Sequence, residues 1–278
     1  MKPALFSQSL FALPLEEAIA ATAEIGFEAI ELACAPPHFD LDTARRDAQG
    51  IVERIRSAGL TTAALSLFNN FTDASVLEEA VGVASAFIRL APLFDADIVK
   101  LTPGPPASAD ATEAHWRCLG EAVSRLVPVA QEAGVRLAFE THMRQLTDTV
   151  AASHQFLELG PAETVGLTVD FSNLAFAGEA VDNLPPAIVG RMYHAHVKNG
   201  YIDAAGGWHF QALDHGLTDY QAVFHTLRRE CYNGYLSVEC LGPDAAERPR
   251  ETARRDLLIL KNLLAEHGAG ATRNPEVA

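Results

Sequence analysis

A junction of helix, glycine and strand recurs along this chain and restricts its fold more than any other feature. An amphipathic segment ends, a glycine follows and a short apolar run begins, as in AEIG-FEAIEL, RSAG-LTTAAL, QEAG-VRLAF and ECYNG-YLSVE, with glycines at positions 26, 59, 134 and 234. Glycine adopts the left-handed conformation that ends a helix without strain, so each junction is typical of a helix leading into a strand. Strands that alternate with helices are expected to pair in parallel through right-handed crossovers.

Apolar runs of strand type are spaced at regular intervals along the sequence. We expect eight strands, which end near Gln8, Glu31, Ser66, Thr102, Glu140, Asp170, His196 and Glu239. The chain has 278 residues, close to the ~250 typical of one eight-stranded α/β barrel. A doubly wound open sheet usually has a glycine-rich turn after its first strand, but SQSLFALP at that position contains no glycine. The sequence therefore predicts a single (β/α)8 TIM barrel over residues 1–267, followed by a flexible tail over residues 268–278.

Polar side chains stand at the ends of four consecutive predicted strands. Strand side chains alternate with period two, so Glu140, Asp170, His196 and Glu239 each lie on the face opposite bulky apolar neighbours. If the apolar face meets the helices, all four point into the barrel at the carboxyl ends of the strands, where barrel active sites are built. Three carboxylates and an imidazole suit a divalent ion, Mn²⁺, Mg²⁺ or Co²⁺, with Zn²⁺ as an alternative. Buried strand-end carboxylates can also be structural, satisfied by lysines or backbone amides.

Five motifs carry a resemblance to a known family: GFEAIEL, LAFETH, LTVDFSN, HAHVKN and NGYLSVE, spread over nearly the whole chain. With them the sequence resembles the sugar phosphate isomerase/epimerase proteins of the xylose isomerase-like TIM-barrel superfamily. The resemblance implies that Glu140, Asp170, His196 and Glu239 hold one divalent metal ion, for which we prefer Mn²⁺. It also implies catalytic roles in proton transfer for Glu140 and Glu239. Asn173 stands where epimerases of this group often carry a histidine.

Further residues are candidates for contacts with a substrate: His142, Lys198, Asn173, Glu31 and His209. His142 follows Glu140 by two residues, so it either projects inward above Glu140 or is a solvated loop histidine. Lys198 stands in the same relation to His196. We expect it either to neutralise an oxyanion or a substrate carboxylate, or to be a surface lysine beside an acidic neighbour.

A structural role is the alternative to substrate contact for some of the remaining residues. Glu31 points inward at the end of the second strand, where it contacts the substrate or forms a salt bridge with Lys100. His194 lies one layer below His196, and we expect it to be a hydrogen-bonded core residue. His209 falls in the long loop before the last helix–strand unit, where a lid would lie.

These residues predict a metal-dependent isomerase or epimerase of an unphosphorylated sugar or polyol-derived keto compound, acting by proton transfer through a metal-stabilised enediolate. The segment TPGPP lacks the backbone donors of a phosphate cradle, because its prolines have no N–H. The alternative is a metal-dependent dehydratase of the inosose or dehydroshikimate type, since both reactions begin by forming the same enolate. A non-catalytic sugar-binding protein would not need both glutamates.

Charge and cysteine content narrow the remaining classes. The formal net charge is −15, with 36 acidic residues against 21 lysines and arginines. This balance disfavours nucleic-acid binding, including that of the endonucleases of the same fold. The four cysteines are far apart, which is typical of reduced thiols. With no apparent signal peptide or membrane-spanning run, we expect a cytoplasmic protein. Barrels of this kind often form dimers or tetramers, so a homo-oligomer is one possible state of this chain.

Overall fold

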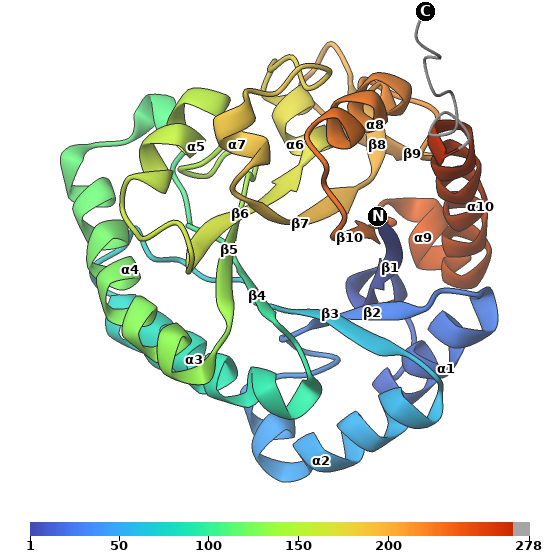
Figure 1. Ribbon diagram of the computed structural model, residues 1–278, viewed down its shortest axis with the longest axis horizontal. Helices are drawn as coiled ribbons and strands as arrows, with labels where there is room; N and C mark the ends of the chain where they lie inside the picture. The colour runs from blue at the N-terminus through green and yellow to red at the C-terminus, as the bar shows by residue number, and fades with distance from the viewer. Residues whose placement is uncertain (269–278) are drawn as a thin grey trace, which may run out of the picture.

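Eight parallel strands close into a barrel in the computed structural model, which describes residues 1–268. They are β1 (Lys2–Phe6), β2 (Ala29–Ala33), β3 (Thr61–Ser66), β4 (Ile98–Leu101), β5 (Arg136–Glu140), β6 (Val165–Asp170), β7 (Met192–Val197) and β10 (Tyr235–Val238). Each barrel strand pairs with its neighbours in chain order, and β1 pairs with both β2 and β10 (Figure 1). The predicted TIM barrel is therefore confirmed. The predicted flexible tail, apart from Gly268, lies outside the described residues.

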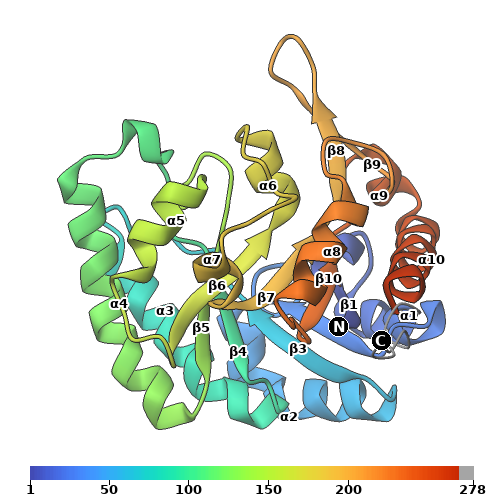
Figure 2. The same cartoon turned by 45° about the horizontal axis from the view of Figure 1, so that its top comes forward.

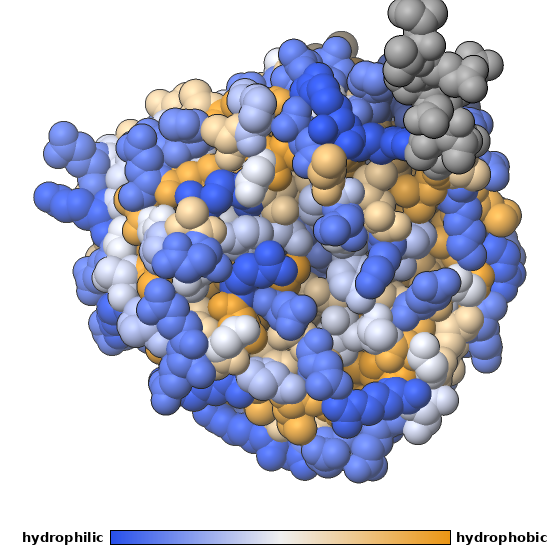
Figure 3. Space-filling model, in the orientation of Figure 1, coloured by the Kyte–Doolittle hydropathy of each residue, from blue (hydrophilic) through white to orange (hydrophobic). Residues whose placement is uncertain are grey.

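Helices surround this ring of strands. They are α1 (Leu15–Ile25), α2 (Leu41–Ser57), α3 (Leu77–Leu90), α4 (Glu113–Ala133), α5 (Val150–Leu157), α6 (Phe171–Phe176), α7 (Pro186–Val189), α8 (Tyr220–Arg229), α9 (Pro243–Glu247) and α10 (Pro249–Gly268), with short 3-10 helices η1 (Ser7–Leu10), η2 (Ala91–Phe94) and η3 (Ser108–Asp110). Gly26 and Gly134 end α1 and α4 in the left-handed conformation, as expected from the junctions. The outer helices present mostly hydrophilic residues to solvent (Figure 3). Within residues 1–268, no helix is both long and apolar enough to cross a membrane.

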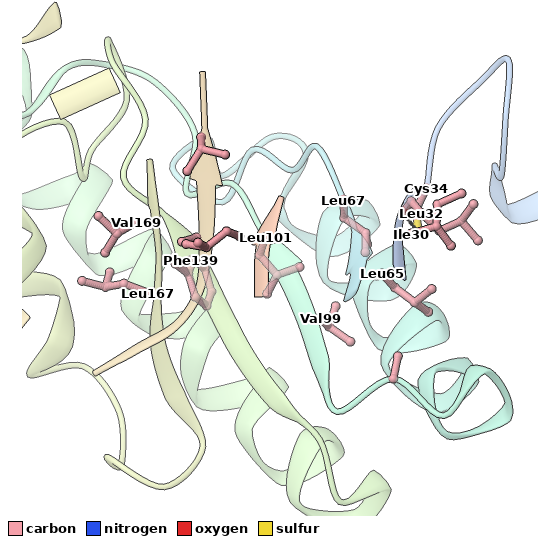
Figure 4. Close-up of a cluster of buried hydrophobic side chains, with 14 of the residues drawn as sticks. Ile30, Leu32, Cys34, Leu65, Leu67, Val99, Leu101, Phe139, Leu167 and Val169 are labelled. Carbon is pink, nitrogen blue, oxygen red and sulfur yellow. Dashed lines mark hydrogen bonds between the residues drawn. The ribbon is translucent and has the colours of Figure 1, made fainter. Parts of the chain in front are cut away.

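The main hydrophobic core lies between the strands and the helices. Its residues include Leu65, Val99, Phe139 and Leu167, all fully buried (Figure 4). Phe139 packs against Phe156 of α5, with ring centroids 4.6 Å apart. Because these side chains leave the strands on the side of the helices, the polar residues that alternate with them enter the barrel, as predicted.

Tyr193 departs from the predicted alternation. It was expected to face the helices, but it packs against Ala64, Ile98 and Ala138 inside the barrel. The pairing of β6 with β7 shifts between Leu167 and Thr168, so that β7 carries one extra residue there. Such a bulge resets the inside–outside pattern. A Cβ atom at Gly166 would lie 2.6 Å from the Tyr193 ring, so glycine makes room for the ring.

An antiparallel hairpin replaces the loop that the sequence predicted after the seventh barrel strand. It consists of β8 (Asn199–Ile202) and β9 (Trp208–Gln211) and projects beyond the ring of helices (Figure 2). The side chain of Asn199 ties the base of the hairpin to the following segment. It donates to the carbonyl oxygens of Leu213 and Thr218, and its Oδ1 accepts from the Thr218 amide.

The start of α2 offers a test of local stability. The Asp40 carboxylate caps this helix by accepting a 2.7 Å hydrogen bond from the Thr43 amide. We expect Asp40→Ala to lower the free energy of unfolding by about 0.5–2 kcal/mol, because the amide loses its partner. Urea unfolding measures the change. Asp42→Ala, one exposed carboxylate further along, is the matched control, and an equal loss in both variants would contradict the capping role.

Candidate metal centre

Four predicted residues meet at the carboxyl ends of their strands. Glu140 and Asp170 are the last residues of β5 and β6, His196 lies on β7, and Glu239 follows β10 directly. Each contributes one nitrogen or oxygen atom to a group in which all four atoms lie within 4.8 Å of one another. The strand register explains this proximity, since Asp170 pairs with His196 and Ser237 of β10 pairs with His196 on its other side. The expected convergence of the four side chains is confirmed.

The donor atoms fit a divalent cation. The Nδ1 atom of His196 is buried and has no hydrogen-bond partner among residues 1–268. It lies 3.4 Å from Glu140 Oε1, without hydrogen-bond geometry, and 3.9 Å from one oxygen each of Asp170 and Glu239. An unpartnered imidazole nitrogen facing three carboxylates is a ligand set that suits Mn²⁺ and its neighbours in the first transition row.

Two buried lysines accompany the carboxylates. Lys198 Nζ lies 2.6 Å from Asp170 Oδ2 and 2.5 Å from Glu239 Oε2, and Lys100 Nζ lies 2.5 Å from Glu140 Oε2. The surface alternative for Lys198 is therefore wrong, since its side chain is only 4% exposed. The predicted alternative pairing of Lys100 with Glu31 is also wrong, because Lys100 binds Glu140 instead. The structural alternative for the carboxylates, that buried lysines pair with them, agrees with these contacts.

These groups set one another's protonation. Burial alone would raise the pKa of Glu140, but the charges of Lys100 and His196 outweigh it and hold that pKa well below its usual range. Burial raises the pKa of Asp170, and the charge of Lys198 offsets only part of this rise. Burial would lower the pKa of His196, but the Glu31 and Glu140 carboxylates raise it to about 10. Such strong mutual coupling in a buried cluster is common at functional sites.

A pocket of about 370 Å³ opens above the four residues at the carboxyl rim of the barrel. Its lining includes Lys100, Glu140, His142, Lys198, Trp208 and Glu239. Trp208 and Phe210 of the hairpin also line the pocket. A strand, β9, therefore lies where the sequence predicted a loop that could form a lid. The volume is in the range of pockets that bind small molecules.

The other predicted substrate contacts are distributed differently around this pocket. His142 lines it, half-buried, with its Nδ1 2.7 Å from the Met143 carbonyl oxygen. Asn173 is buried and does not line the pocket, and its side-chain amide donates to Glu140 Oε1 at 3.2 Å. His209 lies outside the lining. Its ring is half exposed, stacks on Tyr201 and hydrogen-bonds to Asp203.

Glu31 is fully buried below the rim and does not line the pocket. Its carboxylate binds the imidazoles of His194 and His196. This placement leaves Glu31 no surface for direct contact with a substrate, contrary to its predicted substrate contact. The expectation that His194 is a hydrogen-bonded core residue is confirmed.

Sequence reasoning missed the part that Lys100 plays in the site. Its position in IVKL, among buried apolar residues of β4, was the available signal, since an unpaired lysine in a barrel interior is costly. The ring of Phe68, whose centroid lies 5.0 Å from Lys100 Nζ, covers the ammonium group. The sequence pattern could not tell that its acidic partner would be Glu140.

A second cavity, of about 400 Å³, lies at the opposite end of the barrel. It is lined by residues at or near the amino ends of the strands, including Lys2, Thr61, Ile98, Arg136 and Tyr235. Catalytic groups of α/β barrels come from the carboxyl ends of the strands, while the amino ends serve stability. We therefore place the candidate site at the rim with the four convergent residues.

Comparison with known proteins agrees with this architecture. The family described as "Xylose isomerase-like TIM barrel" matches residues 19–263. Inosose dehydratase of Clostridium perfringens is 25% identical over 155 residues, which cover 51% of this chain and 52% of that protein. Inosose dehydratase of Bacillus cereus is 24% identical over 156 residues, with the same coverage. The chain thus spans about half the length of the curated relatives it matches.

Solved structures share the fold at low sequence identity. A probable 3-DHS dehydratase from Bacillus anthracis has a TM-score of 0.79 and 17% identity, covering 94% of this chain and 99% of that one. An L-ribulose 3-epimerase has a TM-score of 0.79 and 20% identity, covering 99% of both chains. The IOLI protein, solved with a binding zinc atom, has a TM-score of 0.81 and 15% identity, covering 96% and 99%.

Proposed function

The chain belongs to the xylose isomerase-like TIM barrel family, and from this premise we propose that it is a metal-dependent dehydratase of an unphosphorylated, polyol-derived keto compound. The similarity of half the chain to inosose dehydratases supports this choice. The observation that carries it is an asymmetry between the two glutamates of the rim, Glu140 and Glu239.

Glu140 is held through both carboxylate oxygens. Lys100 pairs with its Oε2, and the side-chain amide of Asn173 donates to its Oε1. Glu239 is held through one oxygen only, since Lys198 binds Oε2 and Oε1 has no hydrogen-bond partner among the described residues. Glu239 is therefore the glutamate with an oxygen available to take a proton from a substrate. Epimerisation with two opposed bases needs both glutamates, whereas elimination of water needs one base.

Lys198 supplies the second group that dehydration requires. Its ammonium group lies beside Glu239 and lines the rim pocket. A cationic donor at this place can give a proton to the hydroxyl group on the carbon next to the deprotonated one, so that this group leaves as water. The proton that Glu239 takes from the substrate can then return to Lys198, which it contacts. His142, which also lines the pocket, is available to bind another substrate hydroxyl.

Glu140, Asp170, His196 and Glu239 are the residues that would hold the metal ion. When bound, a divalent ion polarises the substrate carbonyl and stabilises the negative charge that forms on its oxygen. Mn²⁺ is our first choice, because three of the four ligands are carboxylates, and Zn²⁺ is the alternative. A cytoplasmic location and self-association remain predictions.

An isomerase of a sugar is the second candidate. One base is also sufficient for a 1,2-shift of a proton on one face of an enediolate, and Glu239 serves either reaction. The single free oxygen of Glu239 in the pocket lining is the observation that supports this candidate as well. The two reactions differ in the fate of the hydroxyl group next to the deprotonated carbon.

Product analysis separates these candidates. We would strip the protein with chelator, restore Mn²⁺, Mg²⁺, Co²⁺ or Zn²⁺ singly, and incubate it in D₂O with inososes, 3-dehydroshikimate, ketoses and aldoses. We expect loss of water, seen by mass spectrometry, only with metal and on a cyclic or acyclic polyol ketone. Deuterium uptake without loss of water would replace the dehydratase by the isomerase. Neither change on any compound, with metal occupancy verified, would count against both.

A further inference from the structure

A second buried cluster adjoins the metal centre and shares His196 with it, but its other two members have no part in the mechanism above. It consists of Glu31 on β2 and of His194 and His196 on β7, all with 0% exposure. Glu31 Oε2 lies 2.7 Å from His194 Nε2, and Glu31 Oε1 lies 2.8 Å from His196 Nε2. β2 and β7 are not neighbours in the barrel, since β1 and β10 separate them, so Glu31 reaches across the interior.

The contact with Glu31 determines which nitrogen carries the proton when the His196 ring is neutral, the form that binds a metal ion. An ionised carboxylate only accepts hydrogen bonds, so Nε2 of His196 must carry the proton that it shares with Glu31. In the neutral imidazole the other nitrogen, Nδ1, then keeps its lone pair, and this is the atom that faces the three carboxylates of the metal centre. Phe6 packs on the face of the ring, with centroids 5.1 Å apart, and restricts its rotation.

We propose that Glu31 is a positioning residue, which holds His196 in the tautomer and orientation that a metal ion requires and thereby sets the affinity of the centre. This inference rests on the metal site of the proposed function. A carboxylate that orients a metal-bound histidine also makes the imidazole more basic, and loss of such a partner typically weakens metal binding about 10–100-fold.

His194 provides the internal comparison. It makes the same kind of bond to Glu31, but it contributes no atom to the four-residue cluster of the metal centre. A packing role for Glu31 would depend on both histidines alike, because both are fully buried and both contact its carboxylate. A positioning role depends on His196 alone. His194→Gln keeps a donor for Glu31 and is therefore the matched control.

The test compares metal affinity in purified wild-type protein, Glu31→Gln and His194→Gln. A chelator-competition titration with Mn²⁺ gives the affinity, and the visible spectrum of the Co²⁺ form reports the ligand geometry. In Glu31→Gln the amide group has the same shape, but it has no charge and only one acceptor oxygen for the two imidazole Nε2 atoms that Glu31 binds. We therefore expect affinity to fall by about 10–100-fold with an altered Co²⁺ spectrum, while His194→Gln stays close to wild type.

Each outcome decides the proposal. Wild-type affinity and spectrum in Glu31→Gln would overturn it, and so would equal losses in the two variants. If Glu31→Gln does not fold, Glu31→Asp replaces it. Aspartate keeps the charge but is one methylene too short to reach His196, so unchanged affinity would overturn the proposal and a weakened one would support it. Wild-type protein that binds no divalent ion would overturn the metal centre itself, a result distinct from failure of Glu31 alone.

Discussion

Glu239→Gln is expected to lower kcat by about 10²–10⁴-fold at saturating metal, which is the usual contribution of a positioned general base. The amide keeps the size of the side chain and an oxygen donor, but it cannot accept a proton. The substitution therefore removes the basicity that the free Oε1 atom of Glu239 provides. The rate of water loss on the substrate found by product analysis is the measurement, with metal occupancy determined for each variant.

Two comparisons make this result specific. Glu247→Gln changes an exposed carboxylate on α9 and should leave kcat unchanged. Glu140→Gln removes the glutamate that Lys100 and Asn173 hold. A smaller loss of kcat in Glu140→Gln than in Glu239→Gln, at full metal occupancy, is expected for a single base. Equal large losses would instead indicate two bases and favour the epimerase mechanism, and a fully active Glu239→Gln would remove Glu239 from proton transfer.

Lys198→Met is expected to destabilise the chelator-treated protein by about 3–5 kcal/mol, the usual loss when one partner of a buried ion pair is removed. Without the ammonium group, Asp170 and Glu239 lie close together in the interior with no cation between them. Mn²⁺ should recover much of this loss, because the ion neutralises the same carboxylates. Urea unfolding with chelator and with Mn²⁺ measures both effects.

Lys261→Met is the control for this second prediction. Lys261 is an exposed lysine whose contact with the Gly26 carbonyl oxygen lies at the surface. Its substitution should change stability little, with or without metal. If Lys198→Met is as stable as Lys261→Met in chelator, the buried lysine does not balance the carboxylates. If Mn²⁺ restores nothing, the carboxylates do not form the metal site.

Lys198 and a bound metal ion would contact the same carboxylate oxygens. The same two oxygens, Asp170 Oδ2 and Glu239 Oε2, face both Lys198 and the open nitrogen of His196. A lysine that shares carboxylates with a metal site stabilises the protein in the absence of the ion. A bound ion would neutralise these carboxylates in place of Lys198, whose ammonium group would then be available for the role that the proposed dehydration gives it.

The sequence by itself determined the barrel and the four convergent side chains. Both follow from short-range patterns: glycine-capped helices before strands, and a period of two along each strand. Parallel strands bring their carboxyl ends to one rim, so a polar residue at the end of each strand was enough to place Glu140, Asp170, His196 and Glu239 together. No knowledge of side-chain conformation was needed for that step.

Only the tertiary structure decided which charged groups pair. Glu31 and Lys100 are both inward residues, and their position allowed a bond between them, yet Glu31 binds His194, 163 residues away, and Lys100 binds Glu140. The extra residue in β7 turned Tyr193 into the barrel, and the hairpin brought Trp208 to the pocket. Contacts across a barrel depend on rotamers, bulges and the tilt of strands far apart in the chain. Local periodicity contains no information on these, because it describes each strand separately.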